Sequence, residues 1–352
     1  MSSASAGVDA DVIVVGGGPV GLAAAIEARL AGLDVIVVEQ REGPIDKACG
    51  EGLMPGALAA LHRLGVDPRG RDFAGIAYVD ATRRVEHRFD GDVGRGVRRT
   101  VLHAALAERA AQIGVRFVHG KVAGLAQEGD TVRAEWDGDD AVARWLIACD
   151  GLHSTVRRIV GRERPPVSPG RRRYGIRRHF AVAPWSDLVE VHWTPEVEAY
   201  VTPVDAGTVG VALLGPPRSD FDAALARIPQ LAVHLDGAPA QSSTRGAGPL
   251  RQRTTRRTAG RVLLAGDASG YVDALTGEGL RVGFAQARSA VRSVVAGDPS
   301  LYERAWSRDT RDFRILTSAL VAAARSPLRG RIVPAAVASP QLFGRIVDRL
   351  AR

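Results

Sequence analysis

Cysteine is scarce in this chain of 352 residues, which contains only Cys49 and Cys149. Two cysteines cannot build a disulfide framework or a cysteine-rich metal cluster, so we expect a reducing, cytoplasmic compartment. The first ten residues also lack the basic and apolar stretches of a secretory signal peptide. Near the C-terminus, the longest uncharged apolar run, residues 315–324, is too short to cross a bilayer. We therefore predict no integral membrane segment, while peripheral contact with a membrane stays open.

Lysine is almost missing as well, because Lys47 and Lys121 are the only lysines among 47 basic residues. The formal net charge of +8 would suit a nucleic-acid-binding protein, but such a strong arginine bias is typical of GC-rich coding. The arginine clusters at 171–173, 177–178 and 251–257 are not interleaved with the aromatic side chains that stack on bases. We therefore expect no nucleic-acid partner, and interpret the arginines as a basic rim that attracts an anionic cofactor or substrate.

The N-terminal residues show the pattern of a β-α-β unit. An apolar strand at 11–15 leads into a glycine-rich turn, a helix at 19–30 follows, and a second buried strand spans 34–38. Parallel strands joined by a helix in this way are typical of a Rossmann-type dinucleotide site.

Three glycines in this turn have distinct expected tasks. Gly16 allows a sharp turn out of the strand, and Gly18 lets the backbone approach a pyrophosphate. Gly21 allows the helix to pack closely against the sheet. The helix N-terminus then presents free N–H groups to the phosphates. Glu39, 21 residues after Gly18, is placed to accept hydrogen bonds from adenosine ribose hydroxyls and to repel the 2′-phosphate of NADP.

Two later segments choose FAD over NAD as the bound dinucleotide. Residues 147–157 (IACDGLHSTVR) resemble the "DG" motif of the flavoprotein hydroxylase superfamily, and residues 261–269 (RVLLAGDAS) resemble its "GD" motif. The resemblance implies that Asp267 accepts a hydrogen bond from a ribityl hydroxyl of FAD and that Asp150 serves the pyrophosphate region. It also implies that Arg99, at the start of a helix, contacts FAD, with Arg98 as the alternative.

The resemblance covers about residues 10–295, and two of its segments are closer to the geranylgeranyl-reductase branch. These segments are 47–53 (KACGEGL) and 273–280 (DALTGEGL). By the resemblance, Gly277 and Gly279 let the backbone run beneath the isoalloxazine and open a helix over 277–295 toward its N1–C2=O edge. Simple phenol hydroxylases usually carry a histidine and a proline at the positions of Gly270 and Ala274, so the sequence departs from that subfamily.

Few side chains are candidates for catalysis. Cys49 is expected either at the substrate face of the flavin or as a small packing residue. Glu51 and Glu278 are candidates for general acids, or for carboxylates that are hydrogen-bonded to backbone. The eight histidines are scattered without metal-pair spacing, so we predict no metal. Residues 246–248 are expected to form a loop and not a second nucleotide site, so NAD(P)H must dock transiently without a Rossmann domain of its own.

The expected fold class is α/β. A Rossmann-type FAD-binding domain of the GR2/hydroxylase-like type is predicted to interleave with a mostly antiparallel β-sheet substrate domain, followed by C-terminal helices. The predicted boundaries are 8–72, 97–170 and 259–298 for the FAD-binding domain, 73–96 and 171–258 for the substrate domain, and 299–352 for the helical cap. The strand-rich regions 73–89 and 171–214 should form the substrate sheet that roofs the flavin, and a short helix is predicted over 221–228. The candidate inward-facing aromatics of the sheet are Tyr174, Phe180, Trp193 and Tyr200.

These features predict an FAD-dependent oxidoreductase. The leading hypothesis is an NAD(P)H- and O₂-dependent monooxygenase that hydroxylates a phenolic or polyketide-like, partly lipophilic secondary metabolite. The alternative is a geranylgeranyl-reductase-like enzyme that reduces prenyl or polyene double bonds. A flavin halogenase ranks last, because the chain has no Trp-x-Trp-x-Ile-Pro segment. The expected partner is a small-molecule substrate, and the sequence itself does not specify an oligomeric state.

Overall fold

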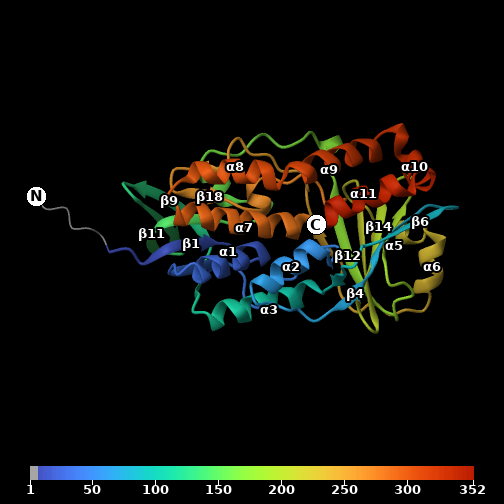
Figure 1. Cartoon of the computed structure of the whole chain (residues 1–352), viewed down its shortest axis with the longest axis horizontal. Helices are drawn as coiled ribbons and strands as arrows, with labels where there is room; N and C mark the ends of the chain where they lie inside the picture. Colours follow the sequence, from blue (N-terminus) through green and yellow to red (C-terminus); the bar gives the residue numbers. More distant parts are fainter. Residues whose placement is uncertain (1–6) are drawn as a thin grey trace, which may run out of the picture.

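Two large sheets lie at opposite ends of an elongated molecule, and helices connect and cover them (Figure 1). The structure is a computed structural model that describes residues 7–352, apart from the side chain of residue 171. The predicted α/β fold class is confirmed.

The first sheet holds the predicted β-α-β unit and has eight strands within residues 7–352. Its main path, in spatial order, consists of β17 (Thr258–Ala259), β18 (Val262–Leu264), β11 (Asp139–Ala148), β1 (Ala10–Val15), β2 (Val35–Glu39) and β8 (Arg116–His119). The strands β9 (Val122–Glu128) and β10 (Thr131–Trp136) add an antiparallel extension through β11. The five strands β18, β11, β1, β2 and β8 run parallel, so their carboxyl ends meet at one edge.

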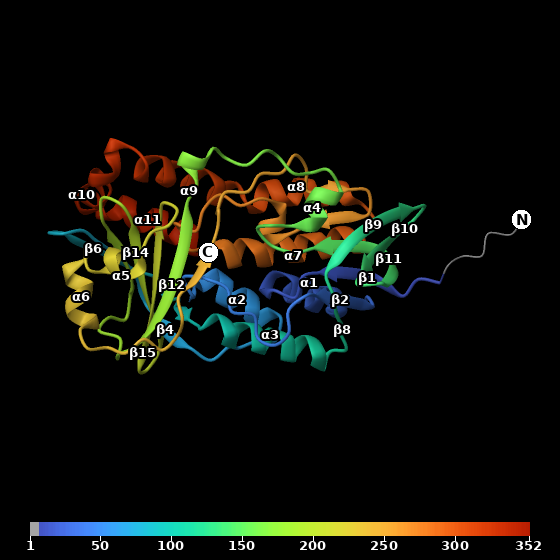
Figure 2. The ribbon, with the colours of Figure 1, turned by 180° about the vertical axis from the view of Figure 1, so that it is seen from behind.

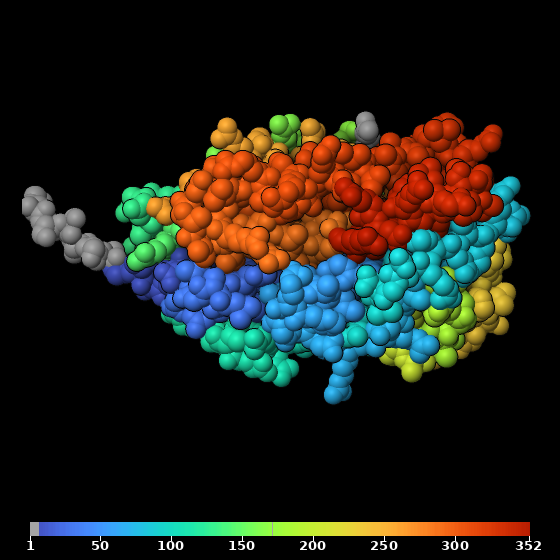
Figure 3. Space-filling model, in the orientation of Figure 1, coloured from blue at the N-terminus to red at the C-terminus, as the bar shows by residue number. Residues whose placement is uncertain are grey.

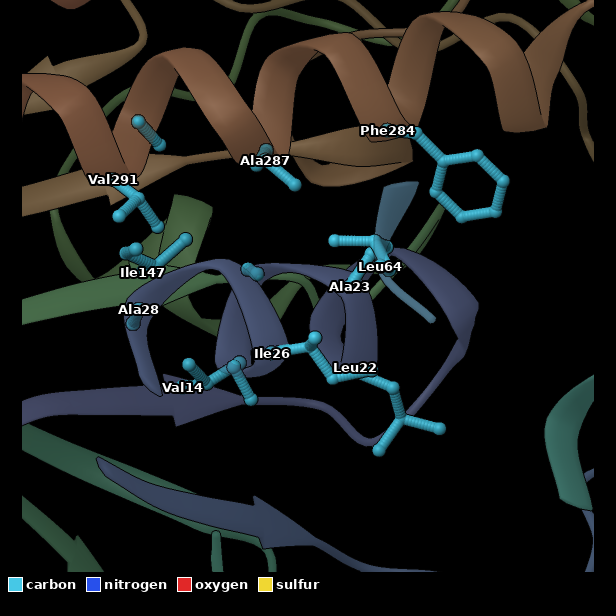
Figure 4. Packing of buried hydrophobic residues seen from close by; sticks show 14 of the residues in the cluster. Val14, Leu22, Ala23, Ile26, Ala28, Leu64, Ile147, Phe284, Ala287 and Val291 are labelled. Carbon is cyan, nitrogen blue, oxygen red and sulfur yellow. The ribbon is translucent and has the colours of Figure 1, made fainter. Parts of the chain in front are cut away.

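Both faces of this sheet are buried, which explains its continuous apolar strands. Val12 and Val14 of β1 belong to the core shared with α1 (Pro19–Leu30), whereas Ile13 and Val15 pack on the opposite side. Figure 4 shows α7 (Gly279–Val295) lying across α1, with its Ala287 above the alanine-rich surface of α1. Small side chains allow these two helices to approach closely.

The remaining helices of this half are α2, α3, α4 and α8. Their bounds are Pro55–Arg63, Arg99–Gln112, Thr155–Ile159 and Pro299–Asp309. A separate three-stranded antiparallel sheet, β3 (Gly52–Leu53), β7 (Gly94–Gly96) and β4 (Arg71–Phe73), lies between the two halves of the chain's fold. The predicted strand region 73–89 is thus divided between this small sheet and the second large sheet.

The second large sheet has seven strands in the described part of the chain and is antiparallel except for one pair. In spatial order it contains β16 (Arg245–Ala247), β12 (Tyr174–Ala181), β15 (Thr208–Gly215), β14 (Glu198–Asp205), β13 (Val189–Trp193), β5 (Gly75–Val79) and β6 (Arg84–Arg88). All of these strands fall inside the expected substrate-domain segments, 73–96 and 171–258. One face packs against α5 (Phe221–Leu225) and α6 (Pro229–Leu235) through Val201 and Val211.

Three local predictions need correction. The single helix predicted at 221–228 is two short helices, α5 and α6, because Pro229 starts a new helix at its first turn. Residues 246–248 are not simply a loop, since β16 pairs with β12 at the sheet edge. The helix predicted from Gly277 begins at Gly279, because Gly277 has a φ of +72° and cannot be helical.

The C-terminal helices cover the other face of the second sheet (Figure 2). They are α9 (Arg311–Ala324), α10 (Ile332–Ala338) and α11 (Pro340–Ala351). Figure 3 shows this C-terminal surface side by side with the region around α2 and β6, which α11 contacts. A buried charge cluster fixes the cap, because Glu198 of β14 binds both Arg173 and Arg329 at 2.6 Å. Arg173 also binds Asp273 at 3.0 Å.

The close packing of α1 makes a testable difference between two glycines. A Cβ on Gly21 would lie 1.8 Å from the carbonyl oxygen of Gly16, whereas a Cβ on Gly18 would meet nothing within 4 Å. Gly21→Ala should therefore lower the free energy of unfolding by about 3 kcal/mol through overpacking. Gly18→Ala should change it by less than about 1 kcal/mol. Urea denaturation of the ligand-free variants measures both, and equal losses would show that this packing is misassigned.

Candidate functional site

A cavity of about 1230 Å³ separates the parallel-strand edge of the first sheet from one face of the second. Its walls include the residues that follow β1, β2 and β11, and the loop at 45–52. The opposite wall is formed by β12 to β15, and α9, α10 and α11 close the far end. The cavity thus has a polar lobe at the strand ends and an apolar lobe under the C-terminal helices.

The glycine turn after β1 forms the floor of the polar lobe. Gly16 has a φ of +100° and Gly18 is the N-cap of α1, where no side chain occupies the capping position. The Glu39 carboxylate accepts a hydrogen bond from the Gly17 amide at 2.7 Å and pairs with Arg41 at 2.9 Å. Burial opposes ionisation of Glu39, but the Arg41 and backbone donors outweigh it and lower its pKa. The ionised carboxylate therefore holds the turn in place at the cavity edge.

Asp150 follows β11 and lines the same lobe. Its Oδ2 accepts a hydrogen bond from the Val156 amide at 3.0 Å, which caps the start of α4. Its Oδ1 is buried and has no partner among the described residues. Burial raises the pKa of Asp150 despite hydrogen bonds from Ser154 and from backbone amides. An unsatisfied buried oxygen at a cavity wall marks a place where a ligand donor fits.

Asp267 follows β18 and reaches the cavity from the other side. Its carboxylate pairs with Lys47 at 3.0 Å, a partner 220 positions away that the sequence did not reveal. The buried Arg157 supports this turn by donating hydrogen bonds to the carbonyl oxygens of Ala268, at 3.2 Å, and Leu152, at 2.8 Å. Arg157 belongs to the "DG" segment, so that segment holds the "GD" turn directly.

Arg99 lines the cavity, and Arg98 does not. The Nε of Arg99 is buried without a partner in the described part of the chain. Arg98 instead points its guanidinium toward His179, at 3.5 Å. The geometry therefore favours Arg99 over the alternative Arg98 as the cavity-facing cation.

Cys49 and Glu51 lie on the loop that enters the cavity between the sheets. Glu51 has a φ of +60°, and its carboxylate accepts a hydrogen bond from the Arg99 amide at 2.8 Å. Its other oxygen lies 2.6 Å from Nε2 of His179 on β12. Both oxygens of Glu51 are thus engaged, one with backbone and one with a side chain. Cys49 Sγ accepts a 3.4 Å contact from the Glu51 amide and faces the cavity.

Glu278 is buried but is not among the residues that line the cavity, whereas Gly277 and Gly279 are. Its Oε2 pairs with Arg281 at 2.5 Å, and its Oε1 has no partner in residues 7–352. Burial, only partly offset by Arg281, raises the pKa of Glu278 to about 7. Arg281 also donates to the carbonyl oxygen of Arg352, so this pair lies against the end of α11.

Two of the four expected aromatic side chains face the cavity, Tyr174 and Tyr200. The hydroxyl of Tyr200 donates to the Leu275 carbonyl at 2.5 Å. Phe180 packs on the far face of the sheet against Phe221. Trp193 packs against Tyr78 and does not line the cavity.

A comparison with known families decides what this arrangement is. The family described as "FAD binding domain" matches residues 9–296. The chain belongs to the FAD-binding flavoproteins. The flavoprotein is an FAD-dependent oxidoreductase, and its resemblance to the hydroxylase and geranylgeranyl-reductase superfamily is confirmed.

Individual relatives carry different names. Menaquinone reductase of Mycolicibacterium smegmatis is 32% identical over 84% of this chain and 79% of the relative. Dialkyldecalin synthase of Streptomyces rugosporus is 31% identical over 78% of this chain, which spans 63% of the relative. Among solved structures, a triple mutant of the flavin-dependent brominase Bmp2 has a TM-score of 0.83. The match covers 97% of this chain and 94% of the brominase chain, and the two sequences are 17% identical. This similarity is one of fold.

The residues of the polar lobe fit FAD in three respects. The open space beside Gly18 leaves room for a group close to the backbone. The unpartnered Nε of Arg99 offers a donor, and the unpartnered Oδ1 of Asp150 offers an acceptor, both at the cavity wall.

Within residues 7–352 the flavoprotein has no helix long and apolar enough to span a bilayer. The same residues contain no group of three or more His, Cys, Asp or Glu side chains arranged to hold a metal.

The buried Glu278 predicts a pH effect on stability. Its pKa rises from 4.5 in the unfolded chain to about 7 in the folded one, so the folded state binds the proton more tightly. The resulting stabilisation is complete below pH 4.5 and is lost as the pH rises to 7. Relative to Glu278→Gln, the parent should lose about 3 kcal/mol of unfolding free energy over that interval. The exposed Glu108→Gln variant should track the parent throughout, and a pH-independent difference between parent and Glu278→Gln would contradict this assignment.

Proposed function

We propose that the flavoprotein is an NAD(P)H- and O₂-dependent monooxygenase that hydroxylates a phenolic or polyketide-like, partly lipophilic molecule. The apolar lobe of the cavity carries this proposal. It is lined by Leu316 and Leu320 of α9, by Ile332 of α10 and by Leu342 and Phe343 of α11. A site this apolar binds an alkyl or polyketide chain through the hydrophobic effect and keeps water away from the reacting centre.

The polar lobe is proposed to hold FAD along its length. Glu39 would bind the adenosine ribose, and the turn at Gly16 and Gly18 would hold the pyrophosphate together with Arg99 and Asp150. Asp267 would bind a ribityl hydroxyl. The backbone at Gly277 and Gly279 would face the N1–C2=O edge of the ring, where the N-terminus of α7 favours negative charge.

Bound FAD supplies the transfer of electrons from NAD(P)H and the activation of O₂, which protein side chains cannot perform. The chain's own contribution is to orient the substrate and exclude water. Tyr200 lies where the apolar lobe meets the loop at 273–280, and its hydroxyl is fixed on Leu275. Cys49 is proposed to line the substrate face of the ring, because it lines the cavity to which both lobes belong. Glu278 is proposed to position the end of α11 through Arg281, and not to donate a proton to substrate.

The end of the cavity at α11 is the proposed entrance for substrate. Leu342 is 58% exposed and Ile346 is 37% exposed, yet both also line the cavity. Residues that face solvent and cavity at once form a rim. An apolar rim suits a lipophilic molecule, whether it arrives from solution or from a membrane surface.

A second candidate function is the reduction of prenyl or polyene double bonds. The specific observation in its favour is that the match to a relative named menaquinone reductase runs through 84% of the chain. The reductase-like segments 47–53 and 273–280 both lie at the cavity. The likeness to a brominase concerns the fold, so a halogenase is not proposed.

Labelled oxygen separates the two candidates. With NAD(P)H, ¹⁸O₂ and a long-chain alkylresorcinol or a related phenolic lipid, one labelled oxygen atom should appear in the product by mass spectrometry. The proposed reaction also yields one water molecule and one oxidised nicotinamide per product. No product should form without oxygen.

The same assay run anaerobically with a polyprenyl quinone is the matched comparison. A product two hydrogens heavier than substrate, formed without O₂ and without label, would replace the monooxygenase by the reductase. Substrate-independent oxidation of NAD(P)H with no product from either substrate class would remove both.

A further inference from the structure

A second concavity, of about 750 Å³, lies behind the turn that carries Asp267. We call it the arginine groove, because six arginines line it. They are Arg164, Arg251, Arg253, Arg257, Arg311 and Arg314. Among the described residues, Asp267 is the only carboxylate in its lining, and that carboxylate already pairs with Lys47.

Most of the positive charge in the groove is not neutralised by protein. In residues 7–352 the side chains of Arg251, Arg253 and Arg311 form no ion pair, and neither does Arg164. Surface arginines elsewhere do find acids, as Arg88 does with Asp187 at 2.7 Å. Like charges gathered on a concave surface repel one another, and a bound anion relieves that repulsion.

Two of the arginines are held in position by an aromatic ring. The guanidinium carbon of Arg257 lies 3.8 Å from the centroid of Trp306, and that of Arg314 lies 5.1 Å from it. Trp306 is itself fixed by a 2.9 Å hydrogen bond from its indole N–H to Ser269. Arg257 also forms an ion pair with Glu303, whose Oε2 lies 3.4 Å from the Nε of Arg257, and burial lowers the pKa of Arg257. These guanidinium groups are therefore preorganised.

The groove and the main cavity share a wall that is one residue thick. Gly266, Asp267, Tyr271 and Gly279 line both spaces. A ligand in the groove would thus lie directly behind the residues proposed to hold the ribityl chain and ring of FAD.

We propose that the arginine groove binds the diphosphate group of an organic ligand. Planar guanidinium groups donate paired hydrogen bonds to phosphate oxygens. Several guanidinium groups together carry more positive charge than a single phosphate group requires, and a diphosphate carries the larger negative charge that matches them. The inference rests on the proposed function, because NAD(P)H is the reductant there and carries a diphosphate. A prenyl diphosphate is the other source of the same group.

The test compares two charge reversals on one exposed segment of the FAD-loaded protein. Arg253 lines the groove, whereas Arg256 is exposed nearby and does not. The probes are inorganic pyrophosphate, ADP-ribose, NADPH and geranylgeranyl diphosphate, titrated by calorimetry at low and high salt. Arg253→Glu should raise the Kd of the bound probes by about tenfold or more, and Arg256→Glu by less than about threefold. Binding should weaken with salt.

Flavin content and reduction by dithionite should be the same in both variants, which establishes that each is folded. If the nucleotide probes bind, Arg253→Glu should raise the NADPH concentration for half-maximal flavin reduction and leave the maximal rate unchanged. If only pyrophosphate and geranylgeranyl diphosphate bind, the groove serves a prenyl diphosphate.

Failure of the groove and failure of the proposed function give different results. No binding of any probe, or equal losses in the two variants, would overturn the groove even if labelled oxygen enters the product. Binding that Arg253→Glu alone abolishes would support the groove even if no oxygen is incorporated.

Discussion

The buried carboxylate of Glu51 is the contact on which the arrangement of the site depends. It accepts a hydrogen bond from the Arg99 amide, at the start of α3, and contacts His179 on β12. It therefore connects the half of the molecule that contains the first sheet to the second sheet. The cavity lies between these two halves. The loop that carries Lys47 and Cys49 lines the cavity and ends at Glu51, so the same residue also anchors this loop. A buried carboxylate with one partner removed is costly, so this junction holds only while both halves are folded.

Local pattern was sufficient to predict the β-α-β unit at residues 10–39 and most of the strands and helices that carry the site. The glycines at 16, 18 and 21 act within a single β-α-β unit, so their spacing alone indicates their geometry. Asp150 and Asp267 were predictable for a related reason, because each follows a strand whose carboxyl end meets the same sheet edge. Both do line the cavity, as does Arg99, whereas Arg98 does not.

Contacts between distant residues could not be predicted in this way. Glu51 looked like a possible general acid, but its partner His179 lies 128 positions away and engages the carboxylate. Glu278 follows a glycine at the cavity, yet its side chain turns to Arg281 and away from the wall. The strand β16 was missed because a three-residue edge strand with two small residues has no periodicity to detect.

The arginine bias has two structural outcomes. Some arginines stabilise the interior: Arg157 donates hydrogen bonds to the turn at Asp267, and Arg173 forms an ion pair with the buried Glu198. Others, in the segment 251–257, gather on a concave surface beside the main cavity. We propose that the basic rim expected from composition is this concave surface, whereas the proposed substrate entrance lies at Leu342 and Ile346 of α11. A charged reductant and a lipophilic substrate would then use different openings.

The central claim is that the polar lobe holds FAD along the glycine turn, and release of the bound flavin tests it most directly. The purified protein should be yellow, and heating should release FAD in a ratio of about one per chain, identified by chromatography against FMN and riboflavin. FMN in place of FAD, or a folded colourless protein that cannot be reconstituted with FAD, would contradict the account.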